Sequence, residues 1–547
     1  MAQRTQPLQH LWEMQPDLGD IWNRSPPPSP PRVNLEWLAS TETQDQLQTA
    51  QTLCLEHGNP AFEKKDRDRA IELLVVELKK ESQLRQSART MSSALLLLSD
   101  GSHAEFLWQI SQRDSLMRSQ VEKALVRWKS PVALSAWRDR LNAPNVRPTE
   151  IADALQGIAE LGGPQDRALL ENVLRGNRTT LANRLLAASA LGQLIDNGLE
   201  ELAQTVLSSD VEQRHLLAAH LLKRHASELS LEKLRLIYDD GSAVAQRIAA
   251  RSICLFFPIA AREYGPQLIA HADPEVRKTA LTFLQKQTDE TSLTLQARLL
   301  QDRNLEVRRM AGRHLIEKAN NGQRGVVDEC ITEHLHGDSH MGIEQAILVS
   351  VVLKDTTRCN RLVELLDHPR EEVNMVAGWG LMEIAEEVAV LEKIHAHLKQ
   401  VTEFLSIDGP VAPIRTTDLI RISYLSEALG RTGYEPAVET LMAYVPKNDF
   451  KLGIVSRASA IWALGQLYQD KDDAALRARL CKRIEDVPPI NPEDNLVRFA
   501  CALALGKMGY EDCISTLEQF NDGTASELGF ACTWALEQIR KSAAKRK

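Results

Sequence analysis

The stretch DNLVRFACALALGKMG, residues 494–509, decides the fold of this 547-residue chain. It begins with Asp494, whose side chain can accept a hydrogen bond from the free N–H groups of a first helical turn. Small and apolar residues follow at helical spacing, so the stretch predicts one helix with a buried stripe. A single cation, Arg498, stands beside that stripe. Such an arginine can be a substrate clamp, a phosphate ligand or part of the scaffold, and the rest of the chain helps to decide between these roles.

The phrase at the end of this stretch, ALGKMG, recurs along the chain. Close copies are GIAELG (157–162), ALGQLI (190–195), ALGRTG (428–433) and ALGQLY (463–468). A period near 30 residues, with every unit predicted helical and no strand between units, is typical of a solenoid built from helix pairs. With looser copies included, the second residue of the phrase falls at positions 95, 125, 158, 191, 221, 255, 284, 315, 348, 381, 429, 464, 505 and 536.

The arginine is part of the repeat. It stands seven residues before the marker position in seven of the fourteen units, and a helix-starting residue stands four residues before it each time. In the copy DPEVR, 273–277, we expect Asp273 to cap a helix, Pro274 to occupy the first helical position and Glu275 to lie near the positive end of the helix dipole. The helix-starting residues are Asp114, Thr180, Asp210, Asp273, Asn304, Gly453 and Asp494.

The pattern D-P-x-V-R, followed by small and apolar residues and by A-L-G-x-L-G, resembles the HEAT repeat, particularly the HEAT-like variety of phycobilisome-lyase-related proteins. The resemblance covers roughly residues 65–540. It implies an α-solenoid in which the second helix of each pair lines the concave face, and in which the Asp and Arg residues form a ladder between neighbouring repeats. The structural caps and ladder residues would then be Asp114, Arg118, Arg184, Asp210, Arg214, Asp273, Arg277, Asn304, Arg308, Arg457, Asp494 and Arg498.

The expected fold is therefore all-α, an α–α superhelix of about fourteen HEAT-like helical hairpins. We expect residues 1–60 to form a disordered linker tail, residues 61–540 the solenoid and residues 541–547 a basic C-terminal tail. The tail contains SPPPSPP, 25–31, which favours an extended polyproline II path. It is most simply a stiff linker, and a docking site for SH3-type or WW-type domains is the alternative.

The composition of the chain argues against some classes of function. The formal net charge of −9 argues against a general nucleic-acid or anionic-membrane partner, because phosphate binding relies on clustered Lys and Arg. No apolar run is long enough for a membrane span, and Met1 is not followed by a signal peptide, so we expect a cytoplasmic protein, or an envelope-associated one if the true start lies upstream. The eight cysteines show no paired spacing, which favours buried thiols in a reducing compartment.

Two intervals between markers are too long, those from 381 to 429 and from 464 to 505. The excess coincides with SIDGPVAPIR (406–415) and EDVPPINPED (485–494), and YVPKND (444–449) stands at the same register between them. Loops at one register of a solenoid emerge on the same edge, so we expect a ridge that binds a partner, although inserted loops are also tolerated wherever they reach solvent. The predicted partner-binding residues are Asp408, Pro410, Pro413, Pro446, Asp449, Pro488, Pro489 and Asn491.

Side chains that could bind a metal crowd together in DECITEHLHGDSH, 328–340. The candidates are His334, His336, Asp338 and His340, but their spacing straddles a predicted loop and matches no closed site. A polar exposed turn is the alternative, and we expect no metal and no cofactor here. In VRWKSPVALSAWRDR, 126–140, tryptophans interleave with cations as in a base-stacking surface, but helical spacing spreads those charges around the axis, which favours packed tryptophans.

No catalytic constellation stands out. HEAT-like arrays include an iron-dependent hydroxylase with repeated His-Glu dyads, but this sequence contains no His-Glu pair. A glycosylase would need a basic face, nothing marks a bilin pocket, and the nucleophile-elbow, P-loop and dinucleotide motifs are missing. We therefore expect a non-catalytic scaffold or adaptor that binds one or more proteins on a concave surface and a ridge of loops. The alternative is an accessory enzyme of the HEAT-like class, bilin-lyase-like or DNA-glycosylase-like.

Overall fold

The computed structural model describes residues 33–546, except 41–42, 60–61, 81–84, 113, 177–178, 407–415, 448–451 and 523–525. Within these residues every regular element is a helix, and no strand is present. The described residues fall into two compact units, 33–283 and 284–546, and the boundary lies within α18 (Pro274–Gln285). Each unit is a stack of antiparallel helix pairs, so the predicted all-α solenoid is confirmed.

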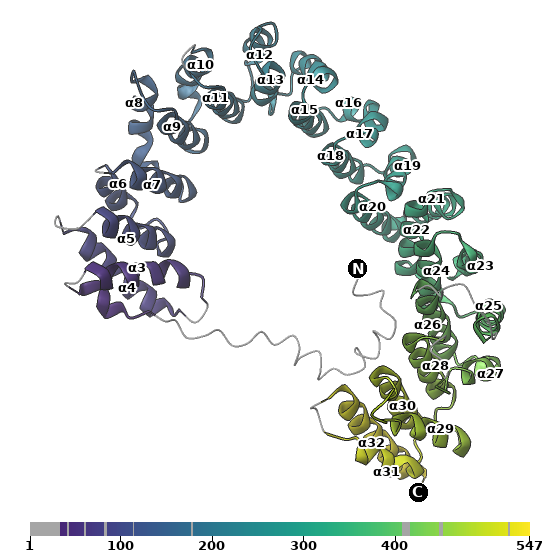
Figure 1. The fold of residues 1–547 in the computed structure, drawn as a ribbon. Coiled ribbons are helices and arrows are strands. Elements are labelled where there is room, and N and C mark those ends of the chain that lie inside the picture. Colours follow the sequence, from purple (N-terminus) through teal and green to yellow (C-terminus); the bar gives the residue numbers. More distant parts are fainter. Residues whose placement is uncertain are drawn as a thin grey trace. The chain divides into compact units, whose positions relative to one another are not determined.

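In the first unit the second helices of successive pairs pack against one another in one row, and the first helices form the row behind them (Figure 1). The second helices are α5 (Arg85–Leu98), α7 (Ser115–Arg127), α9 (Pro148–Leu161), α11 (Leu181–Leu194), α13 (Arg214–Leu222) and α15 (Ala243–Phe256). The first helices are α4 (Lys64–Leu78), α6 (Ala104–Ser111), α8 (Leu134–Asn142), α10 (Arg167–Arg175), α12 (Glu200–Leu207) and α14 (Glu228–Asp240), and α16 (Pro258–Glu263) and α17 (Gly265–Ala270) together take the place of the next.

The second unit repeats this arrangement, and short 3-10 turns precede several helices in both units. Its second helices are α20 (Leu305–Lys318), α22 (His340–Val352), α24 (Glu371–Ile384), α26 (Thr416–Arg431), α28 (Ile454–Leu467), α30 (Asn495–Met508) and α32 (Glu527–Arg546). Its first helices are α19 (Glu290–Arg298), α21 (Arg324–His336), α23 (Cys359–Glu364), α25 (Val388–Ser406), α27 (Val438–Met442), α29 (Ala474–Ile484) and α31 (Ile514–Gln519). Thirteen of the fourteen marker positions fall inside these second helices, and the remaining one, Leu284, falls inside α18, the helix that follows α16 and α17. The period therefore identified the correct helix of each pair.

The glycine of the repeated phrase explains why the second helices approach one another so closely. A Cβ placed on Gly465 in α28 would lie 2.6 Å from the Cα of Ala504 in α30. The same distance separates a Cβ on Gly430 in α26 from the Cα of Ala463 in α28. Carbon atoms in van der Waals contact are about 3.5–4.0 Å apart, so only a residue without a side chain fits at these crossings. The phrase ALG therefore encodes the packing between neighbouring repeats.

The helical packing extends beyond both predicted solenoid boundaries. Before residue 61 lie η2 (Leu35–Ala39) and α3 (Thr43–Glu56), and Leu38, Ala50 and Leu53 are completely buried there. At the other end α32 continues through the predicted basic tail to Arg546, whose guanidinium lies 4.2 Å from the centre of the Tyr510 ring. Apolar burial at one end and stacking at the other thus keep these segments helical. Residues 1–32, which hold the proline run, lie outside the described residues.

The long interval between markers 381 and 429 arises partly from a longer helix rather than only from the predicted loop. The sequence placed its excess in residues 406–415, but α25 extends over 19 residues, from Val388 to Ser406. Part of the extra length of this interval is therefore a longer first helix. The helix extends this far because Leu391, Ile394 and Leu398 continue an apolar stripe that is buried along its length.

Candidate functional site

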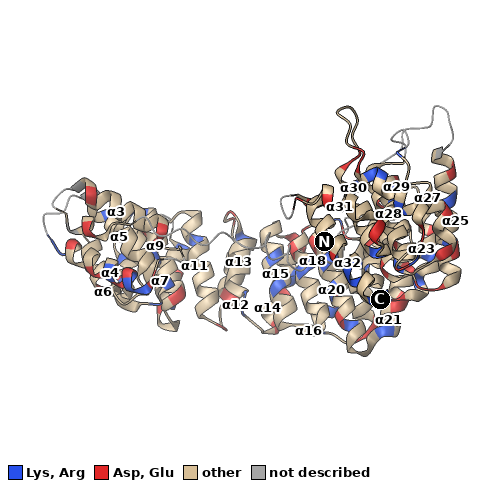
Figure 2. Ribbon diagram, turned by 90° about the horizontal axis from the view of Figure 1, so that it is seen from below, with Lys and Arg blue, Asp and Glu red and all other residues tan. Residues whose placement is uncertain are grey.

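The α29–α30 loop, residues 485–494, extends beyond the ends of the helices that it joins (Figure 2). It presents apolar side chains to solvent: Ile490 is 86% exposed and Val487 is 47% exposed. The predicted binding residues Pro488, Pro489 and Asn491 are all exposed on this loop. Exposed aliphatic side chains of this size on a loop rigidified by prolines are a feature of contact surfaces.

A lysine joins this loop to its neighbour. The Nζ of Lys447, in the α27–α28 loop, donates a hydrogen bond to the main-chain oxygen of Asn491 and lies 3.5 Å from a carboxylate oxygen of Asp486. Pro446, beside Lys447, is exposed. Two of the three predicted loops therefore lie side by side in their described parts, and their role in binding stays a prediction. The other predicted loop residues, Asp408, Pro410, Pro413 and Asp449, lie outside the described residues.

A buried ion pair fixes the base of the α29–α30 loop. Arg457 of α28 donates two hydrogen bonds, of 2.9 and 2.8 Å, to the carboxylate of Glu493, whose side chain is only 1% exposed. Arg483 of α29 lies 3.3 Å from the same carboxylate. Burial raises the pKa of Glu493, but the hydrogen bonds and charge of Arg457, together with the Asp494 N–H and Arg483, outweigh burial, so the pKa lies below its ordinary value. The loop is thus tied to the preceding repeat by a charge-assisted contact.

A cavity of about 620 Å³ opens beneath the two loops, at the N-terminal ends of α28 and α30. Three cations and two carboxylates line it, and the helix dipoles add partial positive charge at the same place. Its apolar lining comes from the first turn of α28, from α26 and from the α29–α30 loop. The lining residues are Leu419, Lys447, Gly453, Ile454, Arg457, Pro492, Glu493, Asp494, Asn495 and Arg498.

Arg498 contacts the preceding helix of its own hairpin and also lines this cavity. Its Nε donates a hydrogen bond of 2.9 Å to the main-chain oxygen of Ile484, and its Nη1 donates one of 3.1 Å to the side chain of Asn495. The guanidinium lies 4.8 Å from the centre of the Phe520 ring. Arg498 is only 8% exposed, and burial lowers the pKa of its guanidinium. It therefore closes its own helical hairpin while also lining the cavity.

The other repeated arginines share the first of these contacts. Each of the seven donates from its guanidinium to a main-chain oxygen at the end of the preceding first helix, so the arginine satisfies a carbonyl that the helix leaves unpaired. The acceptors are Gln112 for Arg118 (3.2 Å), Leu174 for Arg184 (2.9 Å), Ser209 for Arg214 (3.4 Å), His271 for Arg277 (2.7 Å), Asp302 for Arg308 (2.6 Å), Tyr444 for Arg457 (3.2 Å) and Ile484 for Arg498 (2.9 Å).

Several of the predicted cap and ladder residues also form ion pairs between neighbouring repeats. Arg118, 3.9 Å from Glu150, and Arg457 each pair with a carboxylate of the next repeat. The capping aspartates pair instead with other arginines: Asp114 with Arg89 and Asp273 with Arg247, each at 2.7 Å. All seven arginine side chains turn back toward the first helix of their own hairpin, and a ladder that joins all of them between repeats stays a prediction.

The helix caps follow the sequence at most copies. Asp494 accepts from the Leu496 N–H at 2.8 Å, and Asp114, Asp273 and Asn304 accept from N–H groups in the first turn of their helices. The expectation for Asp210 is wrong. Residues 211–213 form a turn that ends with Gln213 in a left-handed conformation, so α13 begins only at Arg214 and lies beyond the reach of Asp210 as a cap.

The candidate metal ligands of the histidine-rich segment do not gather at one site. His334 is buried at the end of α21 and its Nδ1 bonds to the main-chain oxygen of Cys330, while Nδ1 of His336 bonds to that of Thr332. Asp338 lies in the short connection to α22, which begins at His340. Across the described residues no three potential ligands gather into a metal-binding group, and all eight cysteines are free thiols.

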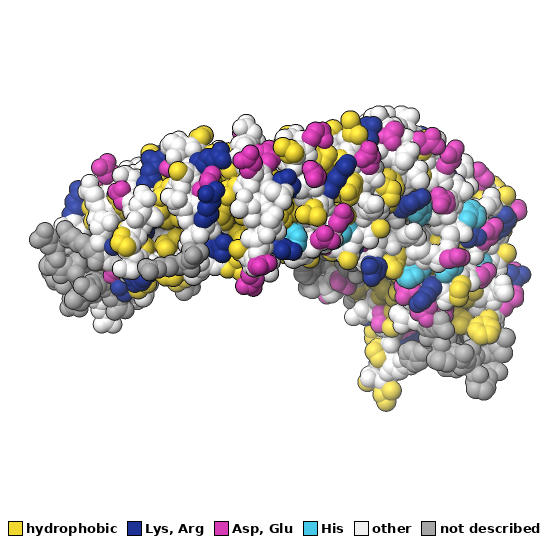
Figure 3. Space-filling view, turned by 90° about the horizontal axis from the view of Figure 1, so that it is seen from above, with side chains coloured by type: hydrophobic (Ala, Val, Ile, Leu, Met, Phe, Trp, Pro, Cys, Tyr) yellow, Lys and Arg dark blue, Asp and Glu magenta, His cyan; other side chains and the backbone are white. Residues whose placement is uncertain are grey.

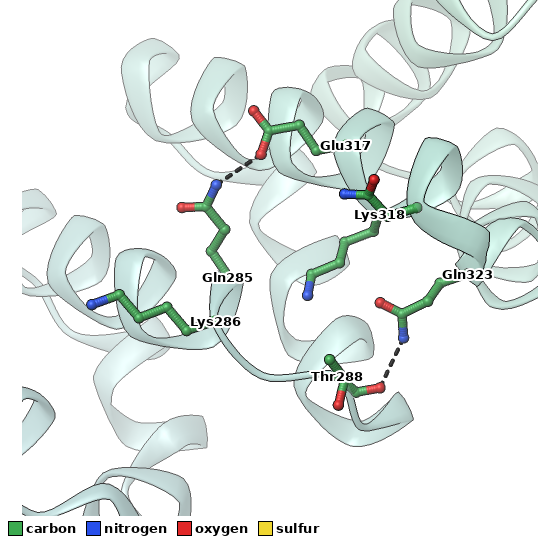
Figure 4. A pocket seen from close by; sticks show the side chains of 7 residues that line it. Gln285, Lys286, Thr288, Glu317, Lys318 and Gln323 are labelled. Atoms are coloured by element: carbon green, nitrogen blue, oxygen red, sulfur yellow. Dashed lines mark hydrogen bonds between the residues drawn. The ribbon is translucent and has the colours of Figure 1, made fainter.

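A second cavity, also of about 620 Å³, lies where α18 and α20 end. Figure 4 shows the side chains that line it and marks two hydrogen bonds, which involve Gln285 and Gln323. Gln285 donates to Glu317 at 2.7 Å, Lys318 donates to the main-chain oxygen of Gln287, and Gln323 donates to that of Thr288 at 2.8 Å. Because these groups are satisfied within the protein, this cavity offers a ligand fewer free donors and acceptors than the first one.

The surface charge on one face and the packing of the tryptophan segment can be compared with the sequence expectation. On the face in Figure 3, side chains of both signs are interspersed and form no large basic area. Trp137 is completely buried against Gly157, and its basic neighbours pair with acids, Arg138 with Asp166 at 2.7 Å and Arg140 with Glu122 at 2.6 Å.

Sequence reasoning missed Lys447, Ile454 and Glu493 as residues of this site. Glu493 stands 36 residues after Arg457, one repeat further on, directly before the capping residue Asp494. An acid beside a cap, one repeat after a buried arginine, is the signal that could have revealed the pair. Lys447 and Ile454 carry no such signal, because only the spacing of the folded repeats brings them to the cavity.

Comparison with known proteins agrees with this architecture. The family model described as PBS lyase HEAT-like repeat matches residues 497–520, which lie in α30 and α31. The search among curated proteins finds no match. Similar solved structures include Kap121p bound to RanGTP, with 12% identity over 91% of this chain and 57% of that chain and a TM-score of 0.50. Kap121p bound to the SUMO protease Ulp1p gives 13% identity over 93% of this chain and 56% of that chain, again with a TM-score of 0.50.

The chain therefore spans a little over half the length of the Kap121p chains that it resembles. At this identity the likeness concerns the fold. Together with the family match and the repeated helix pairs, it shows that the chain has a HEAT-type helical repeat fold.

Proposed function

We propose that this chain is a non-catalytic scaffold or adaptor that binds one or more partner proteins, and that the paired α27–α28 and α29–α30 loops form part of its contact surface. The observation that carries the proposal is the α29–α30 loop, which exposes Val487 and Ile490 while a buried ion pair holds its base. A loop fixed in one conformation loses less conformational entropy on binding than a free one, so its aliphatic side chains contribute more to affinity.

The fold supports the same proposal. Stacked helix pairs present long rows of side chains, and solenoids use such rows for binding. Kap121p, which has a similar fold, is described in complexes with RanGTP, with Nup53p and with the SUMO protease Ulp1p. None of the described helices is both long and apolar enough to cross a membrane. A cytoplasmic location remains a proposal from the sequence.

Affinity capture from the native host tests this function. The full chain is compared with a variant in which residues 487–491 are replaced by a Gly-Ser linker of equal length, leaving Asp486 and Glu493 in place. The matched control replaces residues 143–147, the exposed connection between α8 and α9, in the same way. We expect the first variant to lose at least one partner protein that the wild type and the control both retain, with unchanged helicity by circular dichroism. Equal recovery by all three chains would remove the loop from the contact surface.

A further inference from the structure

No side chain of the described residues caps the N-terminus of α28, unlike that of the neighbouring α30. Gly453 occupies the cap position with a φ of 68° and supplies no side chain, so the first N–H groups of this 14-residue helix find no acceptor among the described residues. In α30 the carboxylate of Asp494 fills this role. Gly453 and Ile454 line the cavity, so the uncapped end of α28 contributes to its wall.

Arg498 adds an uncompensated charge to the same cavity. It is 92% buried, since 8% of it is exposed, yet no described carboxylate lies within ion-pair distance of its guanidinium, and its Nη2 has no hydrogen-bond partner among the described residues. The two carboxylates in the lining are engaged elsewhere: Glu493 pairs with Arg457, and Asp494 caps α30. A buried cation without a counter-ion is costly, and a bound anion would relieve that cost.

The charged residues that line the cavity show how much negative charge it lacks. Lys447, Arg457 and Arg498 stand against Glu493 and Asp494, so the cavity lacks one negative charge. A carboxylate carries one negative charge and matches this. A phosphate dianion would bring a second negative charge that no cation of the lining balances and that Glu493 and Asp494 would repel. Leu419 and Ile454 supply apolar walls beside the donors, which suit the methylene groups of an acidic side chain and its aliphatic neighbours.

We propose that this cavity binds an aspartate or glutamate side chain of a partner protein, in a segment whose neighbouring residues are aliphatic. The carboxylate would accept hydrogen bonds from Arg498 Nη2 and from the first N–H groups of α28, and the aliphatic neighbours would pack on Ile454 and on the exposed α29–α30 loop. The inference rests on the proposed function and specifies the chemistry that the site recognises.

A random peptide library displayed on phage, selected on the immobilised full chain, tests this proposal. We expect enriched sequences to share an Asp or Glu at one position beside aliphatic residues. A synthetic copy of the best sequence then serves as the probe for fluorescence anisotropy. Replacing its acid by the amide should weaken binding about ten- to a hundredfold, the effect of losing one charged hydrogen-bonded contact.

Two protein variants locate the binding on the cavity. Arg498→Met removes the charge, and Ile454→Trp fills the cavity without touching that charge. Each should weaken peptide binding about ten- to a hundredfold. The matched controls are Arg308→Met, which removes the same hairpin contact in another repeat, and Leu305→Trp, which adds the same bulk at the first position of α20. Both controls should bind the peptide as the wild type does.

Three results would overturn the proposal. If no acidic position is enriched, or if Ile454→Trp binds as tightly as Leu305→Trp, the cavity does not take an acidic side chain, although partner capture through the loop could still succeed. If inorganic phosphate displaces the peptide as effectively as the free acidic peptide does, the site serves phosphate. Unchanged partner capture by the variant with residues 487–491 replaced, with peptide binding retained, would instead contradict the loop proposal alone.

Discussion

At the scale of single residues, the repeated arginine does one task at seven places: it satisfies the carbonyls that end the first helix of its own hairpin. This local contact accounts for the regular spacing of the arginines, because the distance from a second-helix arginine to the preceding helix end is set within one hairpin. Arg498 differs from the others in its setting, since it also lines a cavity whose other side chains do not neutralise it.

The repeated glycine has an equally specific role, and it gives a direct test. Gly465→Ala should destabilise the second unit by about 1–3 kcal/mol, because the added Cβ would lie 2.6 Å from the Cα of Ala504 and force α28 and α30 apart. Urea denaturation, with hydrogen exchange of α28 and α30 as the local readout, measures the effect.

The matched control for this change is Gly325→Ala in α21, where an added Cβ meets no atom within 4 Å. It should be neutral or stabilising by up to about 1 kcal/mol, because alanine favours the helix. Equal effects at the two positions would show that the glycine of the repeat does not set the helix spacing.

At the scale of elements, the α29–α30 loop is held at its base and free at its tip. Glu493 fixes one end in the preceding repeat, and Lys447 connects the middle of the loop to the neighbouring loop. Val487 and Ile490 remain exposed between these attachments. A loop that merely extended into solvent would need no buried ion pair at its base. The Arg457–Glu493 pair therefore favours a loop that is held in one position as part of a contact surface.

The ion pair predicts a pH dependence with a defined sign. The pKa of Glu493 is below its unfolded value of about 4.3, so the pair stabilises the fold above that pH and the stabilisation is lost as the pH falls through the folded pKa. The protection of residues 485–498 against hydrogen exchange, corrected for the intrinsic exchange rate at each pH, should therefore decrease in the wild type as the pH falls through the lowered pKa of Glu493.

Glu493→Gln should remove this pH dependence while leaving faster exchange at neutral pH, because Arg457 then lacks its counter-ion. The double variant Arg457→Met, Glu493→Gln should recover part of the loss, since no buried charge remains unpaired. A wild-type loop whose exchange is as insensitive to acid as that of the Gln variant would contradict this account of the loop base.

At the scale of the whole molecule, each repeat depends chiefly on its neighbours, because the helices that pack together are those of adjacent hairpins. Such a chain can lose stability at one end without losing it everywhere. It also offers many surfaces, and the loops at the α28 and α30 N-termini combine an open cavity with exposed aliphatic side chains.

Removing residues 510–547 tests this modularity. The truncation deletes α31 and α32, exposes the face of α30 that packs on α32 and removes the stacking of Arg546 and Arg477 on Tyr510. Hydrogen exchange should rise strongly in α30, less in α28, and remain unchanged in α7, α9 and α11. A uniform rise across both units would instead show that the whole chain unfolds as one cooperative body.

The sequence by itself determined the repeat, and through it the fold: residues such as Leu505, Gly506 and Arg498 recur because packing within and between hairpins imposes the same local contacts on every copy. It also determined most helix starts, since a capping aspartate acts on the N–H groups that follow it directly. It could not determine that Glu493 meets Arg457, that Lys447 reaches Asn491, or that Arg498 borders a cavity. Those contacts join different repeats, and their existence depends on how far one hairpin is displaced along the next, which is set by the packing of whole helices in the tertiary structure.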